Sequence, residues 1–556
     1  MGRCRMGVGE SRKLHGRTVK GIPYERTTHP SSTKTYFKMI SLLSFFKKPN
    51  PSKRQRIERT LDTPLFRYPG TKDAFTLADG VTGVQVLGAT GSGKSSAVCK
   101  LIMRAYLKAG LGFLGLCAKA DELRFWQHMI ETTGRSEDQV VFAPGSSLSF
   151  NFLAYEMHRN GPWTGDTTSV VDLLMRIYEV ITNFRSGNAG TTDERFWENG
   201  MRRLCRNAID LLRIARQPLT FDNIHRVLQD LLTEENVTFY QELWGALGNE
   251  EAPEEQQRTA FQALLELQRE NFILFCINAK NQRKDCSPKE QSLADNVERY
   301  FLKIAPKVPE KTSAIFTESL LGIIEPFISD GILKEHFTEG ISEALRPERT
   351  YQNGTIIITA FPVKEYGLPG VIAQVIMKLQ WQLAMERRVI ESEDDPRPAV
   401  LWVDENQIFL NPQYDSVFQS TSRSSLACTV YISQNLNAYY AAMNGQNVQA
   451  RTKSLLGNLT TKIFCANDDV DTNEFAAKII GKQFTNIEGY SAKAGNRNGT
   501  TSIRKEYHFQ VPPEQFTQLR TGRKRNNFKV ETYVFQTGRR WSNGKNHQLV
   551  TFDQKD

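Results

Sequence analysis

The chain has 556 residues, of which 40% are apolar and 24% are charged. This composition fits a soluble globular protein with roughly two to four domains, and it excludes a fibrous or wholly disordered chain. The net charge is +10, but residues 1–60 carry 15 basic and 3 acidic side chains and residues 481–556 carry 14 and 6. The middle of the chain is therefore acidic. Basic ends are typical of proteins that contact phosphate backbones, although solvated flexible tails have the same composition.

The eight cysteines are scattered and show no metal-ligand spacing, which indicates a reducing compartment without structural zinc. No apolar run approaches the roughly 18 residues that a membrane-spanning helix needs, so we expect a cytoplasmic protein without a transmembrane helix. Residues 1–60 are expected to form a basic, disordered arm. Within it, the apolar run Met39–Phe46 and the lysines after it would suit a contact with the inner face of the cytoplasmic membrane. Translation starting at Met39 is the alternative explanation.

From Thr82 onward the pattern changes to alternating strands and helices, which predicts a parallel sheet. We expect strands at Val84–Leu87, Leu111–Cys117 and Val140–Phe142, and a helix at Ser95–Ala109. Residues 166–347 have helical spacing throughout, and strands return only at Gly354–Phe361, Ala399–Val403 and Leu426–Ser433. The sequence therefore predicts an α/β domain made of residues 61–165 and 348–556, interrupted by an all-α domain at 166–347. Ser491–Ser502 is expected to be a mobile loop.

The first predicted strand is followed by a phosphate-binding motif. The segment Gly88-Ala-Thr-Gly-Ser-Gly-Lys94-Ser95 fits GxxxxGK[ST] and lies between a strand and a helix, the context that a true P-loop requires. Its backbone N–H groups would surround the phosphates, Lys94 would bridge the β and γ oxygens, and Ser95 would bind Mg²⁺. The predicted ATP-binding residues are Gly88, Ala89, Thr90, Gly91, Ser92, Gly93, Lys94, Ser95 and Ser96.

A second acidic motif follows the predicted strand Ala399–Val403. We expect Asp404 to position Mg²⁺ and Glu405 to polarise the attacking water. Gln434, at the end of the strand Leu426–Ser433, is a candidate sensor of the γ-phosphate. Arg423, just before that strand, is either an arginine finger that reaches the ATP of a neighbouring subunit or an ordinary surface arginine.

Taken together, these blocks resemble the coupling ATPases of conjugation and type IV secretion, which belong to the FtsK/HerA superfamily. The resemblance covers residues 65–545 and rests on GATGSGKS, Phe196-Trp197, VLWVDENQ, the spacing from Arg423 to Gln434, and VPPEQF with Gly522. It implies a RecA-like P-loop domain with an inserted all-α domain, assembled as a homo-hexameric ring with ATP at the subunit interfaces. It also implies that Lys94 and Ser95 bind phosphate and magnesium, that Asp404 and Glu405 form the Walker B pair, that Arg423 acts in trans and that Gln434 is the sensor.

The resemblance implies an ATP-driven motor that brings DNA, or a relaxase–DNA complex, to a secretion or conjugation channel. Its contacts with DNA would be largely independent of sequence, and relaxase or accessory proteins would dock on the all-α domain. Typical members begin with two transmembrane helices, which this chain lacks, so a separate membrane partner would provide the anchor. The alternatives are a DNA pump of the same superfamily without a secretion role, and a platform that recruits cargo under the control of ATP.

Overall fold

The computed structural model describes residues 60–159, 165–186, 194–249, 251–392, 396–443, 447–491 and 500–555. The predicted arm at residues 1–60, with the apolar run Met39–Phe46, lies outside these residues except for Thr60. Among the described residues, no helix is both long enough and apolar enough to cross a bilayer.

A nine-stranded sheet forms the centre of the α/β part, in the order β13-β12-β9-β3-β8-β7-β4-β6-β5. The seven strands from β9 to β5 are parallel, whereas β12 and β13 are antiparallel to their neighbours. The strands are β3 (Val84–Leu87), β4 (Gly112–Leu116), β5 (Gln139–Phe142), β6 (Ile356–Thr359), β7 (Ala399–Val403), β8 (Ala427–Ser433), β9 (Thr461–Phe464), β12 (Lys529–Gln536) and β13 (His547–Asp553). This confirms the α/β class, although the sheet is mixed rather than purely parallel.

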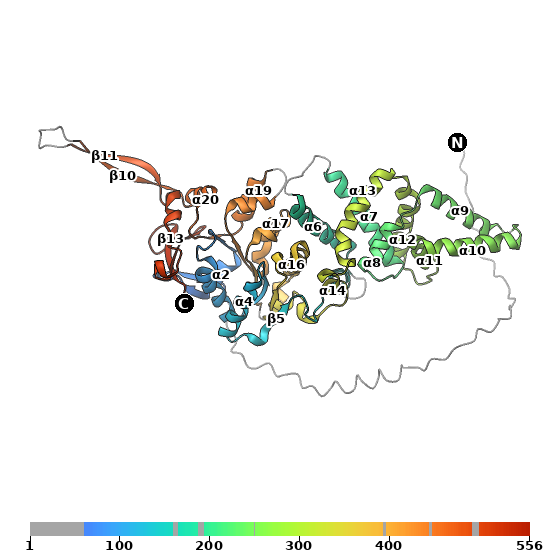
Figure 1. Ribbon diagram of the computed structural model, residues 1–556, viewed down its shortest axis with the longest axis horizontal. Coiled ribbons are helices and arrows are strands. Elements are labelled where there is room, and N and C mark those ends of the chain that lie inside the picture. Colours follow the sequence, from blue (N-terminus) through green and yellow to red (C-terminus); the bar gives the residue numbers. More distant parts are fainter. Residues whose placement is uncertain are drawn as a thin grey trace, which may run out of the picture. The chain divides into compact units, whose positions relative to one another are not determined.

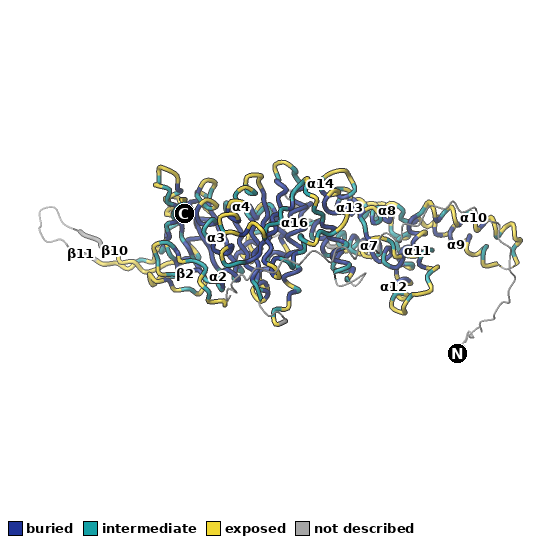
Figure 2. Tube along the Cα trace, turned by 90° about the horizontal axis from the view of Figure 1, so that it is seen from below, coloured by how far each residue is buried: buried dark blue, intermediate teal, exposed yellow. Residues whose placement is uncertain are grey.

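The predicted strands form because their apolar runs are buried on both faces, as is usual for parallel strands. All residues of β7 and β8 are buried. Successive side chains along β7 point to opposite faces, so Val400 and Trp402 join one hydrophobic cluster while Leu401 and Val403 join the other. The first cluster lies under α3 (Lys100–Lys108) and α4 (Ala120–Thr132), and the second under α16 (Val363–Glu386) and α17 (Tyr414–Thr421). Figure 2 shows this buried interior in dark blue.

Between β5 and β6 the described elements are all helical, as the spacing predicted. The helices are α5 (Phe152–His158), α6 (Thr167–Ser186), α7 (Glu194–Ile214), α8 (Phe221–Gln229), α9 (Glu234–Gly248), α10 (Glu254–Glu270), α11 (Phe272–Asn281), α12 (Pro288–Arg299), α13 (Glu310–Ile328), α14 (Ile332–Phe337) and α15 (Arg349–Gln352). The chain leaves the sheet and returns to it at one point, because β5 and β6 are neighbours and the backbone N–H of Ser342 donates to the carbonyl oxygen of Ser149 at 2.8 Å. The backbone N–H of Ser149 in turn donates to Oγ of Ser342 at 3.0 Å.

The remaining elements flank the sheet. They are β1 (Pro64–Arg67), β2 (Ala74–Thr76), α2 (Leu77–Val81), α18 (Leu436–Met443), α19 (Val448–Gly457), α20 (Val470–Ile480), β10 (Lys482–Ser491) and β11 (Thr500–Phe509). Among the described residues, strands β10 and β11 pair only with each other and form an antiparallel hairpin, in which residues 482–487 are exposed (Figures 1 and 2). The prediction of a loop at Ser491–Ser502 is therefore wrong at its ends, where the strand ladder includes Ser491 and Thr500–Ser502. Residues 492–499 lie outside the described part of the chain.

Candidate nucleotide site

The P-loop connects the carboxyl end of β3 to a turn of π-helix at Lys94–Cys99 (η2) that continues into α3. Gly91 and Gly93 have left-handed backbone angles, with φ of 78° and 90°, which a residue with a side chain adopts only under strain. Nζ of Lys94 donates to the carbonyl oxygens of Gly88 at 2.6 Å and Ala89 at 3.3 Å. The loop therefore curls around the ammonium group, as a phosphate-binding loop requires.

Close packing under the loop explains why two of its glycines are needed. A methyl group placed on Gly93 would lie 2.5 Å from Cγ2 of Val530 on β12, and one on Gly88 would lie 2.6 Å from Cβ of Cys465. Both distances are shorter than real carbon contacts. The loop is thus seated directly on the sheet, and its outer residues Thr90, Gly91, Ser95 and Ser96 are exposed.

Ser95 and Asp404 meet at the carboxyl edge of the sheet. Asp404 follows β7, and Oγ of Ser95 donates to its Oδ2 at 3.3 Å. Burial, followed by the neighbouring charge of Glu405, raises the pKa of Asp404 above its ordinary value. The charges of Lys119 and Lys94 act in the opposite direction on this carboxyl. A hydroxyl and a carboxylate are oxygen ligands of the kind that Mg²⁺ prefers. The two side chains therefore fit the predicted magnesium site.

Glu405 is held in place by three side chains. Nζ of Lys119 lies 2.7 Å from Oε1, Nε2 of Gln407 donates to Oε2 at 2.8 Å, and Nε2 of Gln434 lies 3.3 Å from Oε1. Burial raises the pKa of Glu405, but these hydrogen bonds, with Lys119 first, outweigh burial and lower the pKa below its ordinary value. The glutamate is thus an oriented carboxylate. Its backbone is left-handed, with φ of 51° and ψ of 46°, a strain often found at functional sites.

The structure therefore brings together five of the predicted residues: Lys94, Ser95, Asp404, Glu405 and Gln434. They meet because β3, β7 and β8 are parallel neighbours whose carboxyl ends share one edge. The start of the P-loop is also fixed from both sides, since the backbone N–H of Gly88 donates to the carbonyl oxygen of Gln434 at 3.1 Å and that of Ala89 to Ala466 at 2.9 Å.

Arg423 is the predicted site residue that lies apart from the P-loop. It is exposed in a short 3₁₀ turn (η9, Ser422–Ser425) before β8, whereas Gln434 follows the other end of that strand. A strand of seven residues spans roughly 23 Å. Arg423 therefore does not reach the P-loop of its own chain, and any contact of Arg423 with ATP would involve a neighbouring subunit.

Sequence reasoning missed Lys119, which pairs with Glu405. The residue follows β4, and β4 is the parallel neighbour of β7, so Lys119 lies at the same edge of the sheet. No local pattern in the sequence gives this pairing of strands. Lys119 also lies 4.0 Å from Glu122, a carboxyl whose pKa is raised to about 8 by burial and then by Asp404. Lys119 therefore lies between two acidic side chains, Glu405 and Glu122, close to Asp404.

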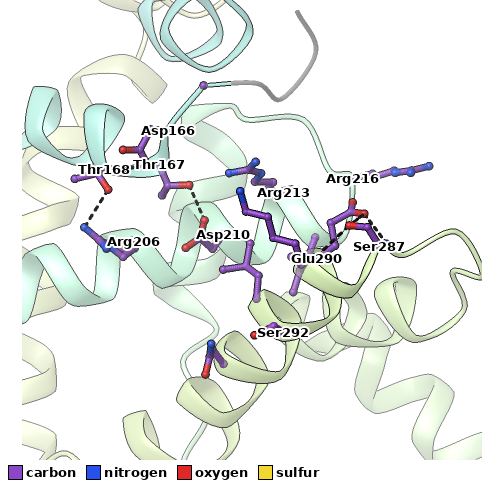
Figure 3. A pocket seen from close by; sticks show the side chains of 15 residues that line it. Asp166, Thr167, Thr168, Arg206, Asp210, Arg213, Arg216, Ser287, Glu290 and Ser292 are labelled. Atoms are coloured by element: carbon purple, nitrogen blue, oxygen red, sulfur yellow. Dashed lines mark hydrogen bonds between the residues drawn. The ribbon is translucent and has the colours of Figure 1, made fainter.

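A separate cavity of about 1030 Å³ lies in the helical part, lined by residues of α6, α7 and α12 (Figure 3). Oγ1 of Thr167 donates to Oδ1 of Asp210 at 2.6 Å across it, and Nη2 of Arg206 donates to Oγ1 of Thr168 at 3.3 Å. Burial raises the pKa of Asp210. None of the residues predicted to bind nucleotide lines this cavity.

Comparisons with known proteins agree with the resemblance seen in the sequence. Residues 398–520, which contain the Walker B pair and Gln434, match the family model described as the TraM recognition site of TraD and TraG. No curated protein matches the chain. The plasmid coupling protein TrwB, in a structure with ADP and Mg²⁺, is 12% identical with a TM-score of 0.55, and the match covers 90% of each chain.

A second TrwB structure, with a non-hydrolysable ATP analogue, is 12% identical with a TM-score of 0.53 over 96% of each chain. At this identity the likeness establishes the fold alone. The chain thus has the RecA-like α/β fold with a helical part that is found in the conjugative coupling protein TrwB, and its residues 398–520 are similar to the TraM recognition site of TraD and TraG.

Proposed function

We propose that this protein is a coupling ATPase that recruits DNA, or a relaxase–DNA complex, and moves it to a type IV secretion or conjugation channel at the expense of ATP. The observation that carries the proposal is the convergence of Lys94, Ser95, Asp404, Glu405 and Gln434 at one edge of the sheet. The last three of these residues lie within the segment that matches the TraD and TraG model. TrwB, whose fold the chain shares, binds ADP with Mg²⁺ in one of its structures.

The residues suggest how hydrolysis would proceed. Lys94 and the P-loop N–H groups would bind the phosphates, while Ser95 and Asp404 would hold Mg²⁺, which neutralises charge on the phosphate oxygens. Glu405 would accept a proton from the attacking water, because its lowered pKa keeps it ionised at neutral pH. Gln434 touches Glu405 and follows the strand beside β7, so it would link the state of the γ-phosphate to the base.

The assembly is also a proposal. We infer a homo-hexamer in which Arg423 of one subunit enters the ATP site of the next, since Arg423 is exposed and far from its own P-loop. Residues 166–347 would act as an all-α domain that receives relaxase or accessory proteins, inserted between residues 61–165 and 348–556 of the nucleotide-binding domain. The basic residues 481–556 favour contacts with DNA phosphates. A membrane partner would place the cytoplasmic ring at the channel.

The test is the steady-state ATPase rate of the purified protein with and without single- and double-stranded DNA, at low and moderate salt. Lys94→Ala serves as the blank, because it removes the phosphate-binding ammonium. We expect DNA to stimulate the rate and salt to reduce the stimulation, since salt weakens phosphate contacts. Basal hydrolysis without stimulation by either DNA would contradict the motor.

Glu405→Gln separates the motor from the two alternatives. The substitution removes the base but keeps the size of the side chain, so ATP binding should persist while turnover and DNA transfer are lost. If transfer by donor cells persists with Glu405→Gln, the chain is a recruitment platform. If DNA stimulates hydrolysis but deletion of the gene leaves transfer unchanged, the chain is a DNA pump without a secretion role.

A further inference from the structure

A loop near the end of the chain lies against the P-loop. This loop, here called the C-terminal loop, spans residues 521–528 and leads into β12. A methyl group placed on Gly91 would lie 3.5 Å from Nη2 of Arg523, which is ordinary van der Waals contact. The guanidinium of Arg523 therefore sits directly beside the outer turn of the P-loop, although the two residues are far apart in the sequence.

The backbone at Arg523 is strained. Its φ is 61° and its ψ is 175°, a combination that is essentially restricted to glycine. Asn527 and Phe528 in the same loop also have positive φ angles, of 52° and 60°. Strain of this kind persists only where the surroundings enforce it, and it gathers at ligand-binding sites.

Gln554 enforces this conformation and joins it to the P-loop helix. The backbone N–H of Arg523 donates to Oε1 of Gln554 at 2.6 Å, and Nε2 of the same amide donates to Oγ of Ser96 at 2.7 Å. The backbone N–H of Phe528 donates to the carbonyl oxygen of Arg523 at 2.8 Å, which closes the loop. One side chain thus fixes Arg523 relative to the first turn of the helix that follows Lys94.

The side chain of Arg523 is exposed to solvent. Among the described residues its exposed guanidinium has no ion-pair partner, whereas the nearby Arg525 donates to Oγ1 of Thr521 and Arg520 pairs with Glu531. A guanidinium suits phosphate oxygens because its planar donors can bind two of them at once. A strained, anchored and unpaired arginine beside a phosphate-binding loop has the features of a ligand contact.

We propose that Arg523 binds the phosphate chain of the nucleotide in the same subunit, from the side of the P-loop where Gly91 lies. This inference rests on the proposed function, because it takes the P-loop as the nucleotide site. The P-loop wraps the β-phosphate, so Arg523 contacts a group that ATP and ADP share. Arg523 differs in this role from Arg423, which lies at the other edge of the sheet and can reach only the nucleotide of a neighbouring subunit.

The test compares Arg523→Ala and Arg523→Gly with Arg525→Ala, which removes the same charge from the same loop. The measurement is the affinity of each full-length variant for ADP and for ATP with Mg²⁺, by calorimetry. Loss of a charge-assisted hydrogen bond weakens binding about 10- to 100-fold. We expect this loss for both nucleotides in both Arg523 variants, and less than a threefold change, on the order of RT, in Arg525→Ala.

Arg523→Gly distinguishes a ligand contact from a structural role. Glycine relieves the backbone strain, so the thermal unfolding midpoint should stay equal or rise while nucleotide affinity falls. Wild-type affinity in both Arg523 variants would overturn the proposal, and so would a loss of equal size in Arg525→Ala. The proposal of a DNA motor can fail separately. If nucleotide binding depends on Arg523 but DNA does not stimulate hydrolysis, the role of Arg523 is supported and the DNA motor is refuted. If the wild-type protein binds no nucleotide, both the role of Arg523 and the proposed ATPase function are refuted.

Discussion

A buried ion pair supports the turn that follows the Walker B strand. Nζ of Lys378 on α16 lies 2.5 Å from Oδ2 of Asp415, and the two side chains are 0% and 1% exposed. The same ammonium donates to the carbonyl oxygen of Phe409 at 2.9 Å. Asp415 also accepts from the backbone N–H of Asn411 and from Nε2 of Gln382, both at 3.0 Å. The pair therefore joins α16 to the chain just after Asp404 and Glu405.

Lys378→Met should destabilise the protein strongly, because it leaves the carboxylate of Asp415 buried with only two neutral donors. Burial of an uncompensated charge in this way costs about 3–5 kcal/mol. Asp415→Leu should cost a similar amount, since it strands the ammonium of Lys378. The double variant removes both charges, so its loss should be smaller than either single loss. We therefore expect a coupling free energy of at least about 3 kcal/mol between Lys378 and Asp415 in a double-mutant cycle of unfolding.

Urea unfolding followed by far-UV circular dichroism provides the measurement. The control is Lys478→Met, which breaks an ion pair of similar length, 2.6 Å to Glu474, on the surface of α20. Its side chains are 64% and 47% exposed, and exposed helix pairs contribute only about 0.3–0.5 kcal/mol. A Lys378→Met loss below about 1 kcal/mol, or single losses that add up in the double variant, would refute the reasoning.

Three further substitutions test packing and titration. Burial raises the pKa of Glu179 to about 7, so the folded state loses stability as pH rises from about 4.5 to 7. Glu179→Gln should therefore raise the thermal unfolding midpoint at pH 8, where the buried glutamate is charged, and leave the midpoint unchanged at pH 4. Burial lowers the pKa of His547 to about 4, so stability should fall as pH drops from about 6.5 to 4, and His547→Gln should reduce that fall in thermal scans. Gly115→Ala would place a methyl group 2.5 Å from the ring of Trp126 and should lower the free energy of unfolding by about 1–3 kcal/mol. The control Gly322→Ala adds a methyl group in open space on α13 and should not destabilise the protein. Equal effects of the two substitutions would show that Trp126 moves aside.

The central strands and the acidic pair could be predicted because each is marked locally. Val84–Leu87 and Ala399–Val403 are short apolar runs that end at glycines or at acids, and burial on both faces explains the runs. Strand β12 was missed although its residues alternate between buried and partly buried positions, because it is antiparallel and lies outside the βαβ repeat. This alternation of residues is the local sequence signal of a strand that has one buried face.

The rest of the site depends on tertiary contacts that no local pattern encodes. Lys119 reaches Glu405 only because β4 and β7 are neighbours in the sheet. Arg523 comes from the far end of the chain and reaches Gly91 through the pairing of β12 with β9. A single sequence gives the order of strands along the chain, but not their order across the sheet.

The hydrogen bonds between Ser149 and Ser342 have a consequence for how such a protein changes over evolutionary time. The described helices from α5 to α14 lie between these two serines in the chain, and β5 and β6 on either side are paired with each other. Recombination between β5 and β6 could exchange the helices that do not touch the sheet, provided that α6 keeps its packing on α16. Recognition of new partners and the chemistry of the P-loop could therefore diverge at different rates within one gene.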